Sequence, residues 1–63
     1  MNIGTKIKKL REGQGITQRQ LAKKAGLSRE GISYIETSAK TPTLESRKKI
    51  AKALGVEIVT LLD

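Results

Sequence analysis

Apolar residues recur at helical spacing along this chain. Ile3, Ile7 and Leu10 are four and three residues apart, and Ile32 and Ile35 repeat the step of three. Residues three or four apart share one face of an α-helix, whereas a half-buried strand alternates every second residue. No segment shows such an alternation with enrichment in β-branched residues. The sequence therefore predicts an all-α fold in which each helix buries one aliphatic stripe.

The length of the chain limits it to one core. A domain of 63 residues buries only about 60% of the surface that its unfolded chain exposes, which leaves no room for a second core. No linker, internal repeat or low-complexity tract interrupts the sequence. We therefore interpret residues 1–63 as one domain. Since the chain has one Tyr and neither Phe nor Trp, the core must be aliphatic.

Several classes of protein are excluded by what the composition lacks. The chain contains no cysteine and no histidine, which excludes a disulfide scaffold, a thiolate or zinc site and histidine-based catalysis. The carboxylates are scattered and no glycine-rich phosphate loop occurs, so we predict no enzyme, cofactor, metal or small-molecule ligand. No apolar run approaches the ~20 residues of a membrane span, and no signal-peptide pattern is present. We therefore expect a cytoplasmic protein.

The charge indicates a polyanionic partner. Thirteen Lys and Arg against six Asp and Glu give a formal net charge of +7. Such an excess is typical of nucleic-acid binding, although solvated lysine faces are also common. Residues 1–40 carry nine basic and three acidic side chains, and residues 41–63 carry four and three. The contact surface is therefore predicted in the first forty residues.

Capping signals predict where the first two helices begin and end. Asn2 can cap a helix that ends near Gly13. Thr17 and Gln20 have the spacing of a capping box, in which each side chain pairs with the backbone N–H of the other residue. Gly26 then ends a second helix of about two turns.

Three further helical segments complete five predicted helices. Ser28 begins the third, and Thr43 and Gly55 bound the fourth. The residues that the fourth helix is expected to bury are Leu44, Ile50, Ala51 and Leu54. The last segment, residues 56–62, is expected to close the core with Ile58, Leu61 and Leu62.

Two short helices joined by a tight turn that contains Gly26 form a helix-turn-helix pattern over residues 17–37. The short turn forces a large crossing angle, which lets the second helix project its outer face into a major groove. At about 100° per residue, one face of that helix is polar, opposite Ile32 and Ile35. The polar face consists of Arg29, Glu30, Ser33, Tyr34 and Thr37.

The chain resembles the lambda-repressor-like, Cro-type (XRE) helix-turn-helix family of DNA-binding regulators. The resemblance covers nearly the whole sequence, from IKKLREGQGITQRQLAKKAGLSREGISYIE through KKIAKALGV to TLLD. It implies a compact five-helix domain that binds double-stranded DNA sequence-specifically. It also implies a transcriptional regulator, with repression favoured over activation.

The same resemblance assigns roles to individual residues. The base-facing positions would be Arg29, Glu30, Ser33 and Tyr34. The residues that hold phosphates or position the helices would be Thr17, Gln18, Ser28, Thr37 and Lys40. Gln18 would in addition brace the first side chain of the recognition helix. Arg11 and Glu36 match positions that form a buried ion pair in several members.

Simpler interpretations remain open for some of these residues. Arg29 is read as a base or phosphate contact in preference to a solvated side chain. Glu30 could accept from a cytosine amino group or could merely stabilise the helix N-terminus. Tyr34 could contact DNA or could pack half-buried.

Departures from the family pattern occur at four positions. Ser38 replaces a glycine, which would be strained if the site is left-handed. Arg47 replaces an apolar residue, so its stem must be buried or the helix must rotate. Glu57 replaces a small hydroxyl cap, and Gly31 lies within the recognition helix.

The residues predicted to form a weak homodimer surface are Ile58, Val59 and Leu62, of which Val59 is expected to be exposed. The leading alternative function is a protein-interaction module on the same scaffold, of the coactivator or antitoxin kind. A truncated or designed DNA-binding domain is the other alternative.

Overall fold

The computed structural model describes residues 2–62. Its elements are α1 (Ile3–Gly13), α2 (Gln18–Ala25), α3 (Arg29–Glu36), α4 (Leu44–Leu54) and the 3-10 helix η1 (Ile58–Leu61). No strand occurs among the described residues, so the all-α prediction is confirmed. The predicted fifth helix is a single 3-10 turn. Glu57 precedes it without a side-chain capping bond, so nothing there favours a longer helix.

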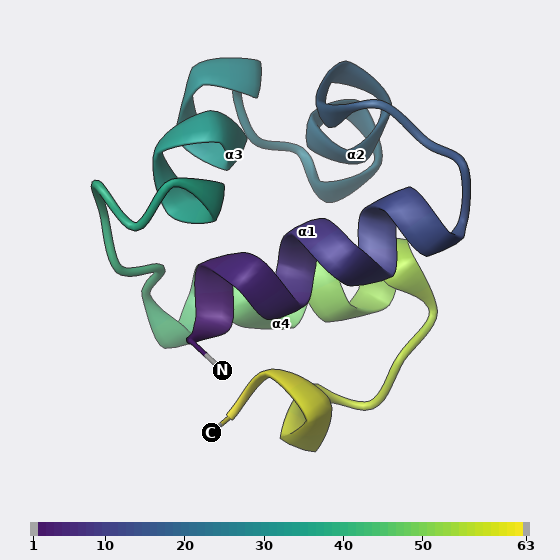
Figure 1. Cartoon of the computed structure of the whole chain (residues 1–63). Coiled ribbons are helices and arrows are strands. Elements are labelled where there is room, and N and C mark those ends of the chain that lie inside the picture. The colour runs from purple at the N-terminus through teal and green to yellow at the C-terminus, as the bar shows by residue number, and fades with distance from the viewer. Residues whose placement is uncertain (1, 63) are drawn as a thin grey trace.

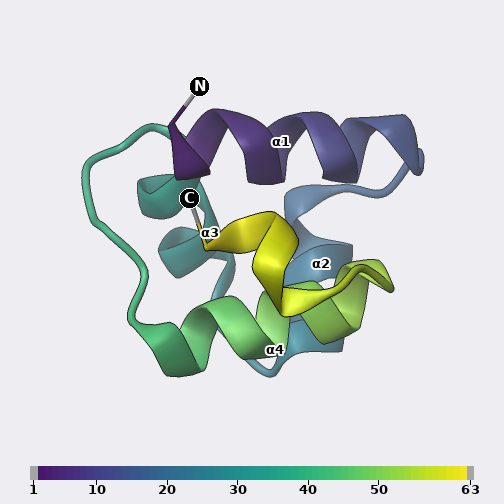
Figure 2. The same cartoon turned by 90° about the horizontal axis from the view of Figure 1, so that it is seen from below.

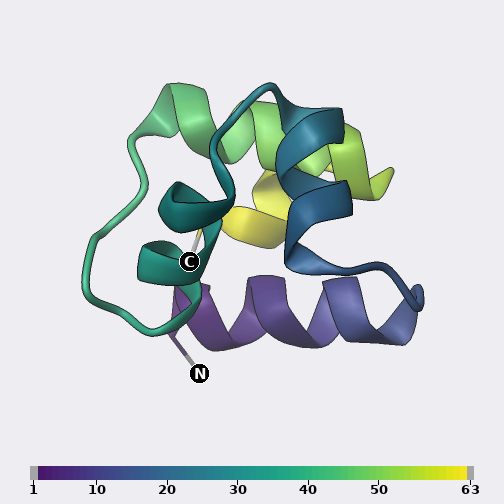
Figure 3. The same cartoon turned by 90° about the horizontal axis from the view of Figure 1, so that it is seen from above.

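The helices are arranged in two layers closed by η1. In Figure 1, α2 and α3 form the upper layer over α1 and α4, and the C-terminal turn lies below them. The view from below shows η1 between α1 and α4 (Figure 2). Seen from above, the connection between α3 and α4 swings around one side of the molecule (Figure 3). Contacts join α2 to α3 and α4, α1 to α3, and η1 to α4 and α1.

The helix boundaries follow the predicted capping residues. The Asn2 side chain accepts a hydrogen bond from the N–H of Thr5 at 2.8 Å. Thr17 and Gln20 form the complete capping box, with bonds of 3.1 and 2.8 Å. Gly26 and Gly55 end α2 and α4 in the left-handed conformation, with φ of 70° and 71°. Only glycine adopts this conformation without strain, which explains why both helices stop there.

The core is aliphatic and small, as the composition requires. Its fully buried side chains are Ile7, Leu21, Ile32, Ile50 and Leu61, so every element contributes one. The prediction that Leu44 and Leu62 are buried in the core is wrong. Leu44 is 53% exposed, because it is the first residue of α4 and lies at the edge of the helix packing. Leu62 is 38% exposed, because it lies beyond the end of η1 at Leu61.

Arg47 occupies a place in the inner stripe of α4. It lies three residues before the fully buried Ile50, and it is half-buried itself. Its Nε is buried and has no hydrogen-bond partner among the described residues. A half-buried stem in this stripe agrees with the expectation that the stem of Arg47 is buried. Among residues 2–62, no helix has the length and apolar character needed to cross a membrane.

Candidate nucleic-acid interface

The turn between α2 and α3 determines how α3 is presented. Only residues 26–28 separate the two helices. Gly26 reverses the chain in the left-handed conformation, and the half-buried Leu27 packs against the core. Ser28 then caps α3, since its Oγ accepts from the N–H of Gly31 at 2.9 Å. The two helices are thus held at a sharp crossing, with one face of α3 left uncovered (Figure 1).

The uncovered face of α3 is polar. Ile32, Ile35 and Glu36 are buried on the inner side of the helix. Four residues of this face are assigned to bases. Arg29, Glu30 and Tyr34 are exposed, and Ser33 is half-buried. The exposed fraction of Tyr34 is 48%, which leaves its ring partly free for a partner. The face therefore offers donors, acceptors and one aromatic ring side by side.

The three hydroxyl residues assigned to phosphates are not equivalent. The Oγ atoms of Thr17 and Ser28 accept backbone N–H bonds as helix caps, which leaves both hydroxyl protons free to donate. Thr37 differs, because its hydroxyl donates to the carbonyl oxygen of Ser33 at 2.9 Å. Thr37 would have to rotate before it could donate to a phosphate.

The segment after α3 folds back tightly and places Lys40 near the polar face of α3. Ser38 has φ 67°, in the left-handed region that favours glycine. The backbone N–H groups of Ala39 and Lys40 both donate to the carbonyl oxygen of Tyr34, at 2.8 and 3.1 Å. The Nζ of Lys40 lies 5.8 Å from the centroid of the Tyr34 ring, within cation–π range. This contact adds a positive charge to the end of the polar face.

An ion pair lies beneath this face. Arg11 donates to Glu36 through Nε at 2.7 Å and through Nη2 at 3.0 Å. A third bond runs from Arg11 Nη1 to the carbonyl oxygen of Ile16, at 2.8 Å. The Glu36 side chain is 1% exposed and that of Arg11 10%. The hydrogen bond to Glu36 raises the pKa of Arg11 above its ordinary value, so the guanidinium keeps its positive charge.

Gln18 connects this ion pair to the exposed face. Its Nε2 donates to Oε1 of Glu36 at 3.0 Å. Its Oε1 accepts from Nη1 of Arg29 at 3.4 Å, a long hydrogen bond on the protein surface. A continuous set of polar contacts therefore runs from Arg11 through Glu36 and Gln18 to the first residue of α3. Nothing in the spacing of these residues along the sequence indicates the link between Gln18 and Glu36.

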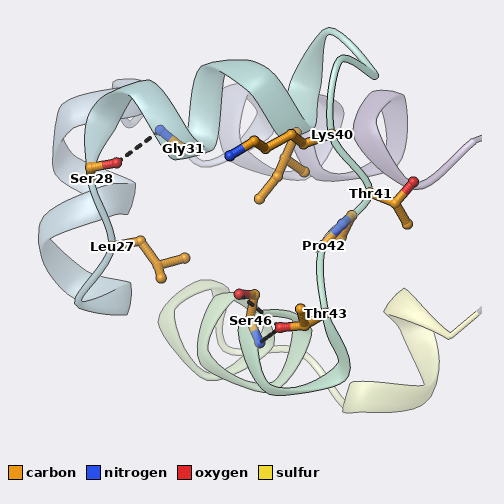
Figure 4. Close-up of a pocket in the computed structure, with 9 residues that line it drawn as sticks. Leu27, Ser28, Gly31, Lys40, Thr41, Pro42, Thr43 and Ser46 are labelled. Carbon is orange, nitrogen blue, oxygen red and sulfur yellow. Dashed lines mark hydrogen bonds between the residues drawn. The ribbon is translucent and has the colours of Figure 1, made fainter.

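A cavity of about 210 Å³ lies between α3, the following segment and the start of α4 (Figure 4). Leu27, Ile35 and Pro42 supply its apolar lining. Its polar lining is provided by Ser28, Lys40, Thr41, Thr43 and Ser46, with the backbone of Gly31. Thr43 and Ser46 hydrogen-bond each other at the start of α4. The cavity thus borders the N-termini of two helices, where N–H groups point outward.

Within residues 2–62 there is no cluster of three or more acidic, cysteine or histidine side chains that could hold a metal ion.

Comparison with known proteins identifies the family. A helix-turn-helix family profile matches residues 7–61. The chain belongs to the lambda-repressor-like, Cro/C1-type helix-turn-helix family. The immunity repressor protein of Bacillus phage phi105 is 37% identical over 62 residues, which are 98% of this chain and 43% of that protein. The transcriptional regulator SinR of Bacillus subtilis is also 37% identical over 62 residues, 97% of this chain and 56% of SinR. Both relatives are regulators rather than enzymes.

Two solved structures share nearly the whole fold of this chain. SinR in complex with DNA superposes with a TM-score of 0.90 at 37% identity, over 97% of this chain and 98% of that one. The restriction-modification controller protein C.AhdI of Aeromonas hydrophila gives a TM-score of 0.91 at 30% identity, over 94% and 89%. The chain spans about half the length of the two curated relatives above.

Proposed function

We propose that this domain binds duplex DNA sequence-specifically, with α3 in the major groove, and serves as the DNA-reading part of a transcriptional regulator, most simply a repressor. One observation carries the proposal: the polar outer face of α3 is uncovered while its inner face is buried. The likeness to SinR, whose structure was solved in complex with DNA, supports it. Such a regulator acts where the DNA is, inside the cell.

The base-reading residues in this proposal are those of the α3 face, Arg29, Glu30, Ser33 and Tyr34. Arg29 offers a fork of donors suited to guanine, and Tyr34 offers a ring edge suited to a thymine methyl group. Glu30 would accept from a cytosine amino group, or would only stabilise the N-terminus of α3. Base contacts of this kind would supply specificity.

The positioning residues would bind the backbone on both sides of α3. Gln18 lies at the start of α2, and Lys40 lies beyond the end of α3. Thr17 and Ser28 can donate from their free hydroxyl protons, and Thr37 could do so after rotation. Contacts to phosphates fix the register of a protein on the duplex without reading sequence.

The salt dependence of binding to a mixed-sequence duplex tests the phosphate contacts. A protein that neutralises phosphates releases counterions, so its affinity must fall steeply between 50 and 200 mM salt. Lys40→Ala should lower the slope of log K against log salt by about 0.9. Lys8→Ala, on the exposed side of α1, is the matched control and should leave the slope nearly unchanged. Binding that does not respond to salt would favour the protein-interaction alternative instead.

We further propose that two copies pair weakly through the C-terminal segment. Val59 is 70% exposed and Leu62 is 38% exposed, beside the half-buried Ile58. So small an apolar patch is well below the area of a stable interface, hence the dimer should be weak. DNA with two half-sites about 34 Å apart would stabilise it by binding both copies.

Sedimentation and titration together test the dimer. The chain alone should sediment mostly as a monomer at micromolar concentration. An inverted-repeat duplex should bind two copies cooperatively, and Val59→Glu should remove the cooperativity while leaving binding to a single half-site intact. A strict one-to-one complex on the inverted repeat would contradict the dimer.

A further inference from the structure

The side-chain amide of Gln18 has only one orientation that suits both of its hydrogen-bond partners. An ionised carboxylate only accepts hydrogen bonds and a guanidinium only donates them. Gln18 lies between one of each, Glu36 on the inner side and Arg29 on the outer side. Its amide nitrogen must therefore face Glu36, and its amide oxygen must face Arg29. The reverse orientation would place two acceptors together and two donors together.

Glu36 is held rigidly enough to transmit this orientation. Its side chain is 1% exposed, and both of its oxygens accept from Arg11, at 2.7 and 3.0 Å. The oxygen Oε1 accepts from Gln18 as well. A carboxylate fixed by two bonds from one guanidinium cannot rotate without breaking them. The amide of Gln18 is thus anchored from inside the domain, although Gln18 is itself only half-buried.

Arg29 is in turn held at one end. Its Nη1 donates to Gln18, whereas its Nε and Nη2 make no hydrogen bond within the described residues. A guanine presents two acceptors, N7 and O6, in the major groove, and a guanidinium edge with two donors matches them. The Nε–Nη2 edge of Arg29 is such an edge, on the first residue of an exposed helix.

We propose that Glu36 is a positioning residue for base recognition: through Gln18 it holds Arg29 so that the Nε–Nη2 edge of the guanidinium donates to a guanine of the half-site. This inference rests on the proposed function, since it concerns the same face of α3. It gives the ion pair with Arg11 a second role beyond the stability of the fold. It also specifies a guanine at the base pair that faces the start of α3.

The test uses a duplex selected from a random pool by the wild-type chain. Each guanine of the selected site is replaced in turn by adenine, with its partner changed to match, and the loss of affinity defines a discrimination ratio. Arg29→Lys keeps the charge but lacks the paired donors, so it identifies the guanine whose ratio collapses. Gln18→Ala should then lower the ratio at that guanine severalfold, since a bidentate pair contributes a factor of about 5 to 150 to discrimination. A loss of phosphate contact alone would weaken all duplexes alike.

Two matched double variants separate positioning from stability. Arg11→Met with Glu36→Leu removes the ion pair and leaves Gln18 without an acceptor. Arg11→Met with Glu36→Gln also removes the ion pair but retains an amide oxygen that can accept from Gln18. The Leu variant should lose discrimination at the Arg29 guanine as Gln18→Ala does. The Gln variant should retain part of it, because its amide oxygen still accepts from Gln18 although Arg11 no longer fixes the side chain.

The possible results separate a positioning role of Glu36 from a purely structural role. If the folded Leu variant discriminates as well as wild type, Glu36 is only structural and the inference is wrong. Equal losses in the Leu and Gln variants would also overturn it. If neither double variant melts cooperatively, Gln18→Ala alone decides, and an unchanged ratio would refute the positioning role. If the wild-type chain enriches no motif at all, the proposed function itself fails. If the wild-type chain enriches a motif in which no guanine depends on Arg29, only the positioning role of Glu36 fails.

Discussion

Gly4 in α1 packs directly against the backbone of Ile35 at the end of α3, so closely that a Cβ atom at residue 4 would overlap the carbonyl oxygen of Ile35. The carbonyl oxygen of Glu36 would be 3.1 Å from the same Cβ. Both neighbours are backbone atoms, which cannot move aside as the end of a side chain can. The contact between α1 and α3 thus depends on the absence of a side chain at Gly4.

Gly4→Ala should therefore destabilise the domain, even though alanine favours helices. Overpacking of this kind costs about 1–3 kcal/mol, which is a large part of the stability of so small a domain. Gly13→Ala is the control, since Gly13 also lies in α1 but has open space around its Cβ position. Gly13→Ala should stabilise by about 0.5–1 kcal/mol. Urea unfolding of both variants measures the difference, and equal effects would contradict the close packing at Gly4.

The core assignment is tested by two apolar residues of opposite exposure. Ile35 is 7% exposed and Leu44 is 53% exposed. Ile35→Ala should cost about 2–5 kcal/mol through the cavity that it leaves, enough to unfold much of the population. Leu44→Ala should change the free energy of unfolding by less than about 1 kcal/mol, because little burial is lost. A large effect at Leu44 in thermal unfolding would mean that the edge of α4 is packed after all.

Substitutions of Arg11 and Glu36 should have strongly non-additive effects on the free energy of unfolding. Arg11→Met leaves the Glu36 carboxylate buried without its partner, which costs about 3–5 kcal/mol. Arg11→Met combined with Glu36→Leu removes both charges, so it should be clearly more stable than the single variant. Melting temperatures of the single and double variants provide the comparison. If the two variants melt together, the carboxylate is not stranded by the loss of Arg11.

Strain at Ser38 should be relieved by glycine. Ser38 is exposed and has φ 67°, where a side chain is unfavourable by about 1 kcal/mol. Ser38→Gly should accordingly raise the melting temperature by a few degrees. Ser38→Ala retains a Cβ atom and should not. A glycine variant that melts no higher than the alanine variant would show that the turn is not strained.

Local chemistry made most of the fold predictable. The capping bonds of Asn2 and Thr17, and the left-handed glycines Gly26 and Gly55, depend on residues within one turn of each other. The exposed face of α3 likewise follows from the helical period alone. Such features need no knowledge of how the helices pack.

Features that depend on distant packing were not predictable. Gly4 is one glycine among six in the sequence until α3 is placed against it. Leu44 fits the apolar stripe of α4, yet the core ends before it. The bond between Gln18 and Glu36 joins residues 18 positions apart, and its existence depends on the crossing of α2 and α3. The contacts of Arg11 with Glu36 and of Gln18 with Arg29 were expected from the resemblance, whereas the bond that joins Gln18 to Glu36 was not.

Parallel selection from a random duplex pool tests the central claim, that the outer face of α3 reads DNA sequence. One selection uses the wild-type chain, and the other uses a variant in which Arg29, Glu30, Ser33 and Tyr34 are all alanine. These side chains lie outside the core, so the variant should still melt cooperatively. The wild type should enrich one motif, and the variant should bind DNA weakly without enriching that motif. The same motif from both chains, or none from the wild type, would contradict the claim.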